Sequence, residues 1–86
     1  MLTRPLVITA TWDAEVSVWV ATSDDVPGLA TEAPSLDILI PKLKVMIPEL
    51  LEANGYEDGD DIPFKVVGEI NEVAHRQAAF ATAYFR

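Results

Sequence analysis

Acidic side chains are the residues of this 86-residue sequence that could do chemistry. Asp13 and Glu15 follow one stretch of strand-like composition, and Asp24 and Asp25 follow a second. If these strand ends met at one edge, their carboxylates could together hold divalent metal ions. Adjacent Asp24 and Asp25 point opposite ways in an extended segment, so at most one would serve a given site. Turn formation explains the same carboxylates more simply, and we expect no metal, no cofactor and no catalytic residue.

Other chemical groups are sparse. His75 is the single histidine and the sequence has no cysteine, so a thiolate nucleophile or thiolate metal site is excluded. The acidic run EDGDD at residues 57–61 lacks the spacing and the closing glutamate of a calcium loop. The sequence therefore favours a protein that is not an enzyme.

Net charge is the strongest bulk property, at −8. Residues 1–43 hold two basic and six acidic residues, and residues 44–86 hold four and eight, so the charge is spread over the chain. Such a surface repels nucleic-acid phosphates and attracts a basic protein, although charge also serves solubility alone. No targeting signal or membrane-length apolar run is visible, and we expect a cytoplasmic protein. A core this small also favours a homo-oligomer.

Two stretches of alternating character predict antiparallel strands, at residues 6–12 and 16–22. The first would direct Leu6, Ile8, Ala10 and Trp12 to one face. In the second, we expect the valines at 16, 18 and 20 to face the core. Trp19 would then lie on the open face, as an interface residue or under cover of the C-terminal tail. Its candidate partners in a binding surface are the corner carboxylates Asp13, Glu15, Asp24 and Asp25.

Pro27 and Gly28 form the best turn signal, because proline pre-sets one dihedral angle and glycine accepts a positive φ. A short strand over 29–33 and a long amphipathic helix capped by Ser35 should follow. The helix contains two prolines. They predict either a kink near Ile40 or a helix that starts at Pro41. Asn54-Gly55 would end it.

The last element should be a strand over residues 62–70 that returns parallel to the first. This order predicts an α+β fold, β-β-β-α-β, with an antiparallel meander, a returning strand and one long helix packed on one face. We place a single domain at residues 1–70. A C-terminal tail follows at residues 71–86, and it is expected to be helical or partly disordered.

At this point the residues resemble the HicB-like antitoxin superfamily, in particular a subfamily of uncharacterised bacterial stand-alone domains. The likeness covers about residues 6–70. It is sharpest at SDDVPGL (residues 23–29), with PELLEANG (48–55) more particular to the subfamily. The sequence departs from the family at Ala33-Pro34-Ser35 and at Pro41. Residues 71–86 are also too short for the DNA-binding module that many members carry, so no direct nucleic-acid contact is expected.

The resemblance implies a toxin–antitoxin role. HicB proteins neutralise small, basic, RNA-cleaving HicA toxins, so a HicA-like protein is the expected partner, and antitoxins of this kind commonly form homo-oligomers. The HicB fold also resembles a reduced ribonuclease H fold. That likeness leaves one alternative, a metal-dependent nuclease that uses Asp13 or Glu15 with Asp24. A further alternative, a homodimeric structural domain that buries Trp19, is compatible with the antitoxin role.

Overall fold

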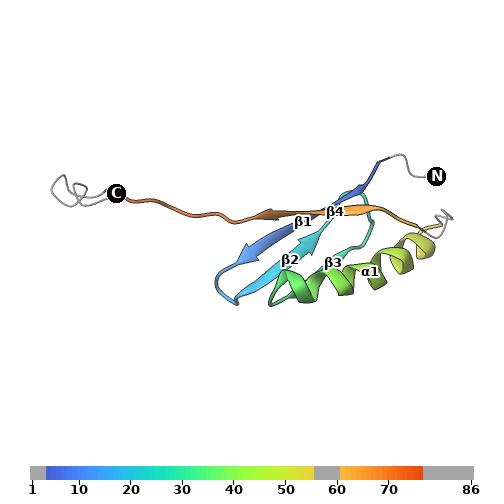
Figure 1. Ribbon diagram of the computed structural model, residues 1–86, viewed down its shortest axis with the longest axis horizontal. Coiled ribbons are helices and arrows are strands. Elements are labelled where there is room, and N and C mark those ends of the chain that lie inside the picture. Colours follow the sequence, from blue (N-terminus) through green and yellow to red (C-terminus); the bar gives the residue numbers. More distant parts are fainter. Residues whose placement is uncertain (1–3, 56–60, 77–86) are drawn as a thin grey trace.

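The structure is a computed structural model that describes residues 4–55 and 61–76 (Figure 1). Within these ranges the chain forms, in order, β1 (Leu6–Asp13), β2 (Val18–Thr22), β3 (Ala30–Ala33), α1 (Leu36–Ala53) and β4 (Phe64–Glu69). The predicted β-β-β-α-β order and the α+β class are therefore confirmed.

The strands form one mixed sheet in the order β3-β2-β1-β4. β1 pairs antiparallel with β2 and parallel with β4, and β2 pairs antiparallel with β3. The meander therefore has the expected connectivity. The helix supplies the long crossover that a parallel strand needs, and β4 returns beside β1 as expected.

The loop between β1 and β2 is longer than the sequence suggested. β2 begins at Val18, whereas the expected strand began at Val16, whose side chain is 62% exposed. Ser17 closes the loop: its backbone N–H donates to the Asp13 carbonyl oxygen at 2.8 Å, and its φ is 58°. This closure places Asp13 opposite Val18 and Trp12 opposite Trp19.

That register corrects the predicted facing of β2. Trp12 lies on the helix side of β1, so its partner Trp19 lies there too. Val18 and Val20 instead lie on the open face. The expectation was wrong because it assigned the valines to the core by hydrophobicity, whereas the core position on β2 is held by the small Ala21, which is fully buried.

α1 is a single helix that begins at Leu36. The Ser35 hydroxyl accepts a hydrogen bond from the Ile38 backbone N–H at 3.2 Å, which confirms the predicted cap. The alternative start at Pro41 is therefore wrong. Pro41 and Pro48 both lie inside the helix at exposed positions, where water can solvate the carbonyl groups they leave unpaired.

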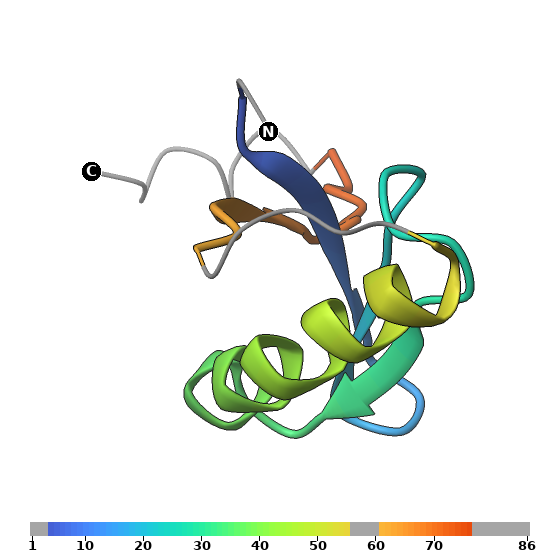
Figure 2. The same ribbon diagram turned by 90° about the vertical axis from the view of Figure 1, so that its right-hand side faces the viewer.

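The core lies between α1 and one face of the sheet (Figure 2). The helix buries Leu39, Leu43, Ile47 and Leu51. The sheet and its connecting corner contribute Leu6, Ile8, Ala10, Ala21, Val26, Leu29 and Ala33. Alanines dominate the sheet side beneath the helix, so the two layers can approach closely. Gly28, with φ of +83°, lies under Leu50 and makes the predicted turn after Pro27.

Beyond β4 the chain runs away from the sheet as an extended segment (Figure 1). Residues 71–76, which one expectation made helical, contain neither helix nor strand, and every residue from Val67 to Arg76 is exposed. Residues 77–86 lie outside the described residues. Across the described ranges, no helix combines the length and apolarity that a membrane span requires.

We predict that Leu43→Ala lowers the free energy of unfolding by about 2–5 kcal/mol, because Leu43 is fully buried at the centre of the helix. Urea denaturation measures the effect. Val45→Ala is the matched control on the outer side of the same helix. Since Val45 is 60% exposed, its loss should cost about 0.5 kcal/mol or less. Equal losses for the two variants would contradict the assigned helix face.

Candidate protein-binding site

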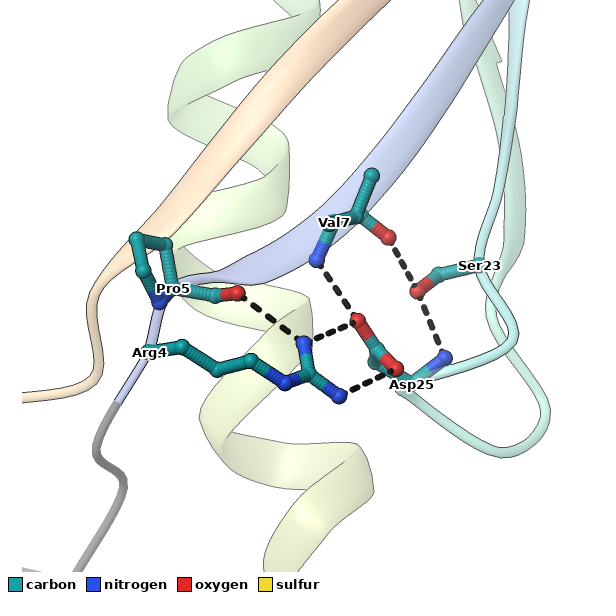
Figure 3. A network of polar contacts seen from close by, with 5 residues as sticks. All are labelled: Arg4, Pro5, Val7, Ser23 and Asp25. Atoms are coloured by element: carbon teal, nitrogen blue, oxygen red, sulfur yellow. Dashed lines mark hydrogen bonds and ion pairs between the residues drawn. The ribbon is translucent and has the colours of Figure 1, made fainter.

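The corner after β2 is held to β1 by a network of polar side chains (Figure 3). The Val7 backbone N–H donates to Asp25 Oδ2 at 2.8 Å, and the Ser23 hydroxyl donates to the Val7 carbonyl at 2.6 Å. Ser23 Oγ also accepts from the Asp25 backbone N–H at 3.0 Å. Arg4 adds an exposed ion pair with Asp25 at 3.4 Å.

This network replaces a missing stretch of strand pairing. The paired ladder between β1 and β2 ends at Thr9 and Thr22, while β1 continues back to Leu6. Val7 would therefore leave its backbone groups unpaired on the β2 side. The side chains of Ser23 and Asp25 satisfy both groups. The acidic corner is thus explained by backbone chemistry, and Asp25 has a structural role.

The hydrogen bond from Val7 is the main cause of a lowered pKa at Asp25, and the hydrogen bond and charge of Arg4 lower it further. Partial desolvation acts in the opposite direction and is outweighed. A lowered folded-state pKa means that the ionised carboxylate stabilises the fold at neutral pH. The contribution is lost as the pH falls through the lowered pKa.

Asp13 has a similar local role at the other end of the hairpin. Its carboxylate accepts from the Glu15 backbone N–H at 3.0 Å, as in an Asx turn. The hairpin pairs Asp13 with Val18 and Thr9 with Thr22, so Asp13 and Glu15 lie about 13 Å or more from Asp24 and Asp25. The expectation that these carboxylates could converge is therefore wrong.

No metal site emerges from this arrangement. Among residues 4–55 and 61–76, no group of three or more histidine or acidic side chains could hold an ion. The five residues proposed as one partner-binding surface are also divided between the two ends of the hairpin and the helix side of the sheet. A role of any one of them in binding stays a prediction.

Trp19 lies in an aromatic cluster on the helix side of the sheet. Its ring centroid is 5.3 Å from that of Trp12, in an edge-to-face arrangement at 61°. The ring also lies against Gly68 of β4, where a Cβ atom on that residue would be 3.7 Å from the indole. Trp19 is half-buried and packs against the core, so much of its contact area is intramolecular.

The face of the sheet that points away from α1 is not covered by any helix or strand of the described residues. It is rich in β-branched side chains, and we call it the open face throughout: Val7, Thr9, Thr11, Val18, Val20, Thr22 and Val67. One row crosses all four strands in the order Glu32, Val20, Thr11, Glu69, with a carboxylate at each end. This combination of apolar centre and charged rim is typical of a protein interface.

A cleft of about 520 Å³ lies on the other side, between the C-terminal half of α1 and the segment that enters β4. Ile47, Pro48, Ile62, Pro63 and Phe64 form its apolar walls, and the exposed Lys44 and Asp61 complete its lining. This lining contains no serine, threonine, cysteine or histidine. Most of its walls offer apolar contact.

Sequence reasoning expected an open face but assigned the wrong β2 side chains to it, and it missed the partners of Asp25. The facing of β2 depends on a loop of four residues, Ala14–Ser17, which is longer than the predicted break. Once β2 is placed, the alternation of Thr9 and Thr11 with buried neighbours predicts the open face directly. Ser23 carried a signal as well, since a serine two residues before an aspartate commonly bonds to local backbone.

The described residues form a small α+β domain in which one helix covers one face of a four-stranded mixed sheet. The chain belongs to a family described as a domain of unknown function, DUF1902, whose model matches residues 5–78. A crystal structure of a hypothetical protein, TTHA1013 from the extremely thermophilic bacterium Thermus thermophilus, is similar, with 49% identity and a TM-score of 0.65. The match covers 85% of this chain and all of that one. No curated protein matches.

We predict that Asp25→Asn lowers the urea midpoint at pH 7, because the ionised carboxylate bonds to Val7 and Arg4. The difference from the wild type should shrink as the pH falls from the ordinary pKa of aspartate through the lowered pKa of Asp25, where the folded wild-type carboxylate becomes protonated. Asp24→Asn, which changes the net charge equally at an exposed neighbour, should have little effect. A difference in urea midpoint that is the same at pH 7 and at a pH below the lowered pKa of Asp25 would contradict this role.

Trp19→Ala should lower the free energy of unfolding by about 2–4 kcal/mol, because it removes a half-buried ring packed on Trp12 and Gly68. Thermal or urea denaturation measures this loss. The variant tests the corrected position of Trp19: an unchanged stability would place the ring outside the core.

Proposed function

We propose that this chain is a non-catalytic, HicB-like protein-binding module that neutralises a small, basic, RNA-cleaving protein. The open face of the sheet would be the surface that binds it. The single observation that carries the proposal is the row from Glu32 through Val20 and Thr11 to Glu69, an apolar centre between two carboxylates on an uncovered sheet.

Charge supports the choice of partner. A ribonuclease that binds RNA phosphates presents a basic surface, and an acidic module can occupy that surface sterically and electrostatically. The net charge of −8 would speed the encounter, while the row of Val20 and Thr11 would supply apolar contact. Lys65 is the one basic side chain that the described strands direct to this side of the sheet, and it lies at the β4 edge.

The family likeness also supports a binding role, through the SDDVPGL stretch on which the resemblance to HicB rests. In this structure, Ser23 and Asp25 of that stretch pin the corner to β1 and set the end of the open face. The stretch therefore helps to shape the surface proposed to bind the partner. The metal-dependent nuclease has no comparable support, since its carboxylates lie at opposite ends of the hairpin.

The proposal predicts that a small basic protein is encoded beside this gene. After co-expression, that protein should co-purify with the chain and lose its RNA-cleaving activity in the complex. The proposal would be contradicted if no neighbouring gene encodes a small basic protein and no basic protein co-purifies with the chain.

Matched charge reversals locate the surface. Glu32→Lys should weaken binding of that protein by about tenfold or more, because it places a positive charge against a basic partner at the rim of the open face. Glu49→Lys changes the net charge equally but lies at an exposed position on α1, and it should have a much smaller effect. Titration calorimetry measures both. Equal losses would show that only the overall charge matters.

A further inference from the structure

The outer edge of β4 is an open strand edge. β4 has six residues, Phe64–Glu69, and β1 is the strand it pairs with in the described part of the chain. Exposed apolar side chains accompany this edge: Val67 is 44% exposed, Ile70 is 55% and Val73 is 79%. A long edge with unpaired backbone groups and apolar side chains is a template for pairing with another strand.

The direction of the free backbone groups follows from the register. Leu6 N–H donates to the Pro63 carbonyl, and Leu6 is the partner of Phe64. In a parallel ladder this pattern repeats every second residue, so odd-numbered residues of β4 bond to β1. The N–H and C=O groups of Phe64, Val66 and Gly68 therefore point outward, away from the sheet.

The opposite edge of the sheet is protected in a way that β4 is not. β3 has only four residues, and Lys42 of α1 donates through Nζ to the Glu32 carbonyl at 2.7 Å. Short edge strands and covering lysines are standard means of preventing strand addition. The contrast singles out β4 as the edge that is available for pairing.

We propose that β4 pairs antiparallel with β4 of a second copy of this chain, about a two-fold axis at Val67. The result is a dimer with one continuous sheet. This inference concerns self-association and does not require the proposed toxin partner, although Val67 and Glu69 belong to both surfaces.

Charge complementarity selects the register. With the axis at Val67, Lys65 lies opposite the partner's Glu69, and the same pair recurs on the other side of the axis. The outward groups of Val66 then meet those of the partner's Gly68, which satisfies both strands. If the axis moves to Val66 or Gly68, the outward groups still pair, but Lys65 faces Val67 or Asn71 and no opposite charges meet.

Apolar contacts also fit this register. On the open face, Val67 meets the partner's Val67 as a close, non-hydrogen-bonded pair. On the helix side, Val66 meets the partner's Gly68, and the partner's Trp19 ring lies beside that glycine. Ile70 follows in line opposite the partner's Phe64, a wall of the cleft. The dimer thus covers much of the apolar surface near β4.

The charges set the register more than the affinity, since exposed ion pairs contribute little. Two chains of −8 also repel each other at long range. This repulsion is screened beyond about 8 Å at physiological ionic strength. Association should therefore be measured at that ionic strength, where the short-range backbone and apolar contacts dominate.

Cysteine cross-linking tests the axis, because the natural chain has no cysteine. Val67→Cys places two thiols in a non-hydrogen-bonded cross-strand pair, about 4.5 Å apart at Cα, within the range that a disulfide spans. Val45→Cys is the matched control at an exposed valine on α1. At micromolar protein, Val67→Cys should form the disulfide dimer about a hundredfold faster, because pairing raises the effective thiol concentration towards millimolar. Equal rates would overturn the proposal.

Charge reversal tests the register without cysteine. Lys65→Glu should favour the monomer, because it places a glutamate at position 65 opposite the partner's Glu69. Glu69→Lys should also favour the monomer, because it places a lysine opposite the partner's Lys65. The double variant Lys65→Glu with Glu69→Lys should restore the dimer. Sedimentation equilibrium of all three and of the wild type measures the effect, and circular dichroism confirms folding. A monomeric wild type, or a double variant as weak as the single ones, would overturn the proposal.

Discussion

The burial of one stripe of α1 against one face of the sheet is the contact on which the rest of the structure depends. Four helix side chains, Leu39, Leu43, Ile47 and Leu51, fill the space above a sheet surface made largely of alanine and isoleucine. Because the domain has a single helix in its described part, this burial can cover only one face. No helix or strand among residues 4–55 and 61–76 covers the other face of the sheet or the far side of β4.

These uncovered surfaces account for the functional proposals. The open face combines β-branched side chains with carboxylates at its rim, which suits a basic protein. The β4 edge offers unpaired backbone groups beside Val67, which suit a second copy of the same strand. The open face and the β4 edge both include residues of β4. Pairing at that edge would join two sheets into one and place two open faces on the same side of it. By contrast, the corner carboxylate Asp25 is used to complete the backbone pairing of β1.

The sequence predicted the elements and their order well, because helical and strand periodicities, the Ser35 cap and the Pro27-Gly28 turn are local signals. It failed at the facing of β2. The facing of β2 depends on loop closure at Ser17. This serine adopts a positive φ, which a sequence pattern predicts most readily where a glycine is present. A shift by one residue moves every side chain to the other face, so Trp19 and the valines exchanged places. The predicted partner-binding surface contained the same error, since it placed Trp19 on the open face.

The most direct test of the account is which valine methyl groups respond to a small basic protein encoded beside this gene, the partner that the account predicts. In a methyl-labelled sample, the account predicts saturable NMR shift changes at Val18 and Val20 on the open face, with the methyl groups of Val45 on α1 unaffected. Changes confined to α1, or none at any valine while the two proteins bind, would contradict the assignment of the open face as the binding surface.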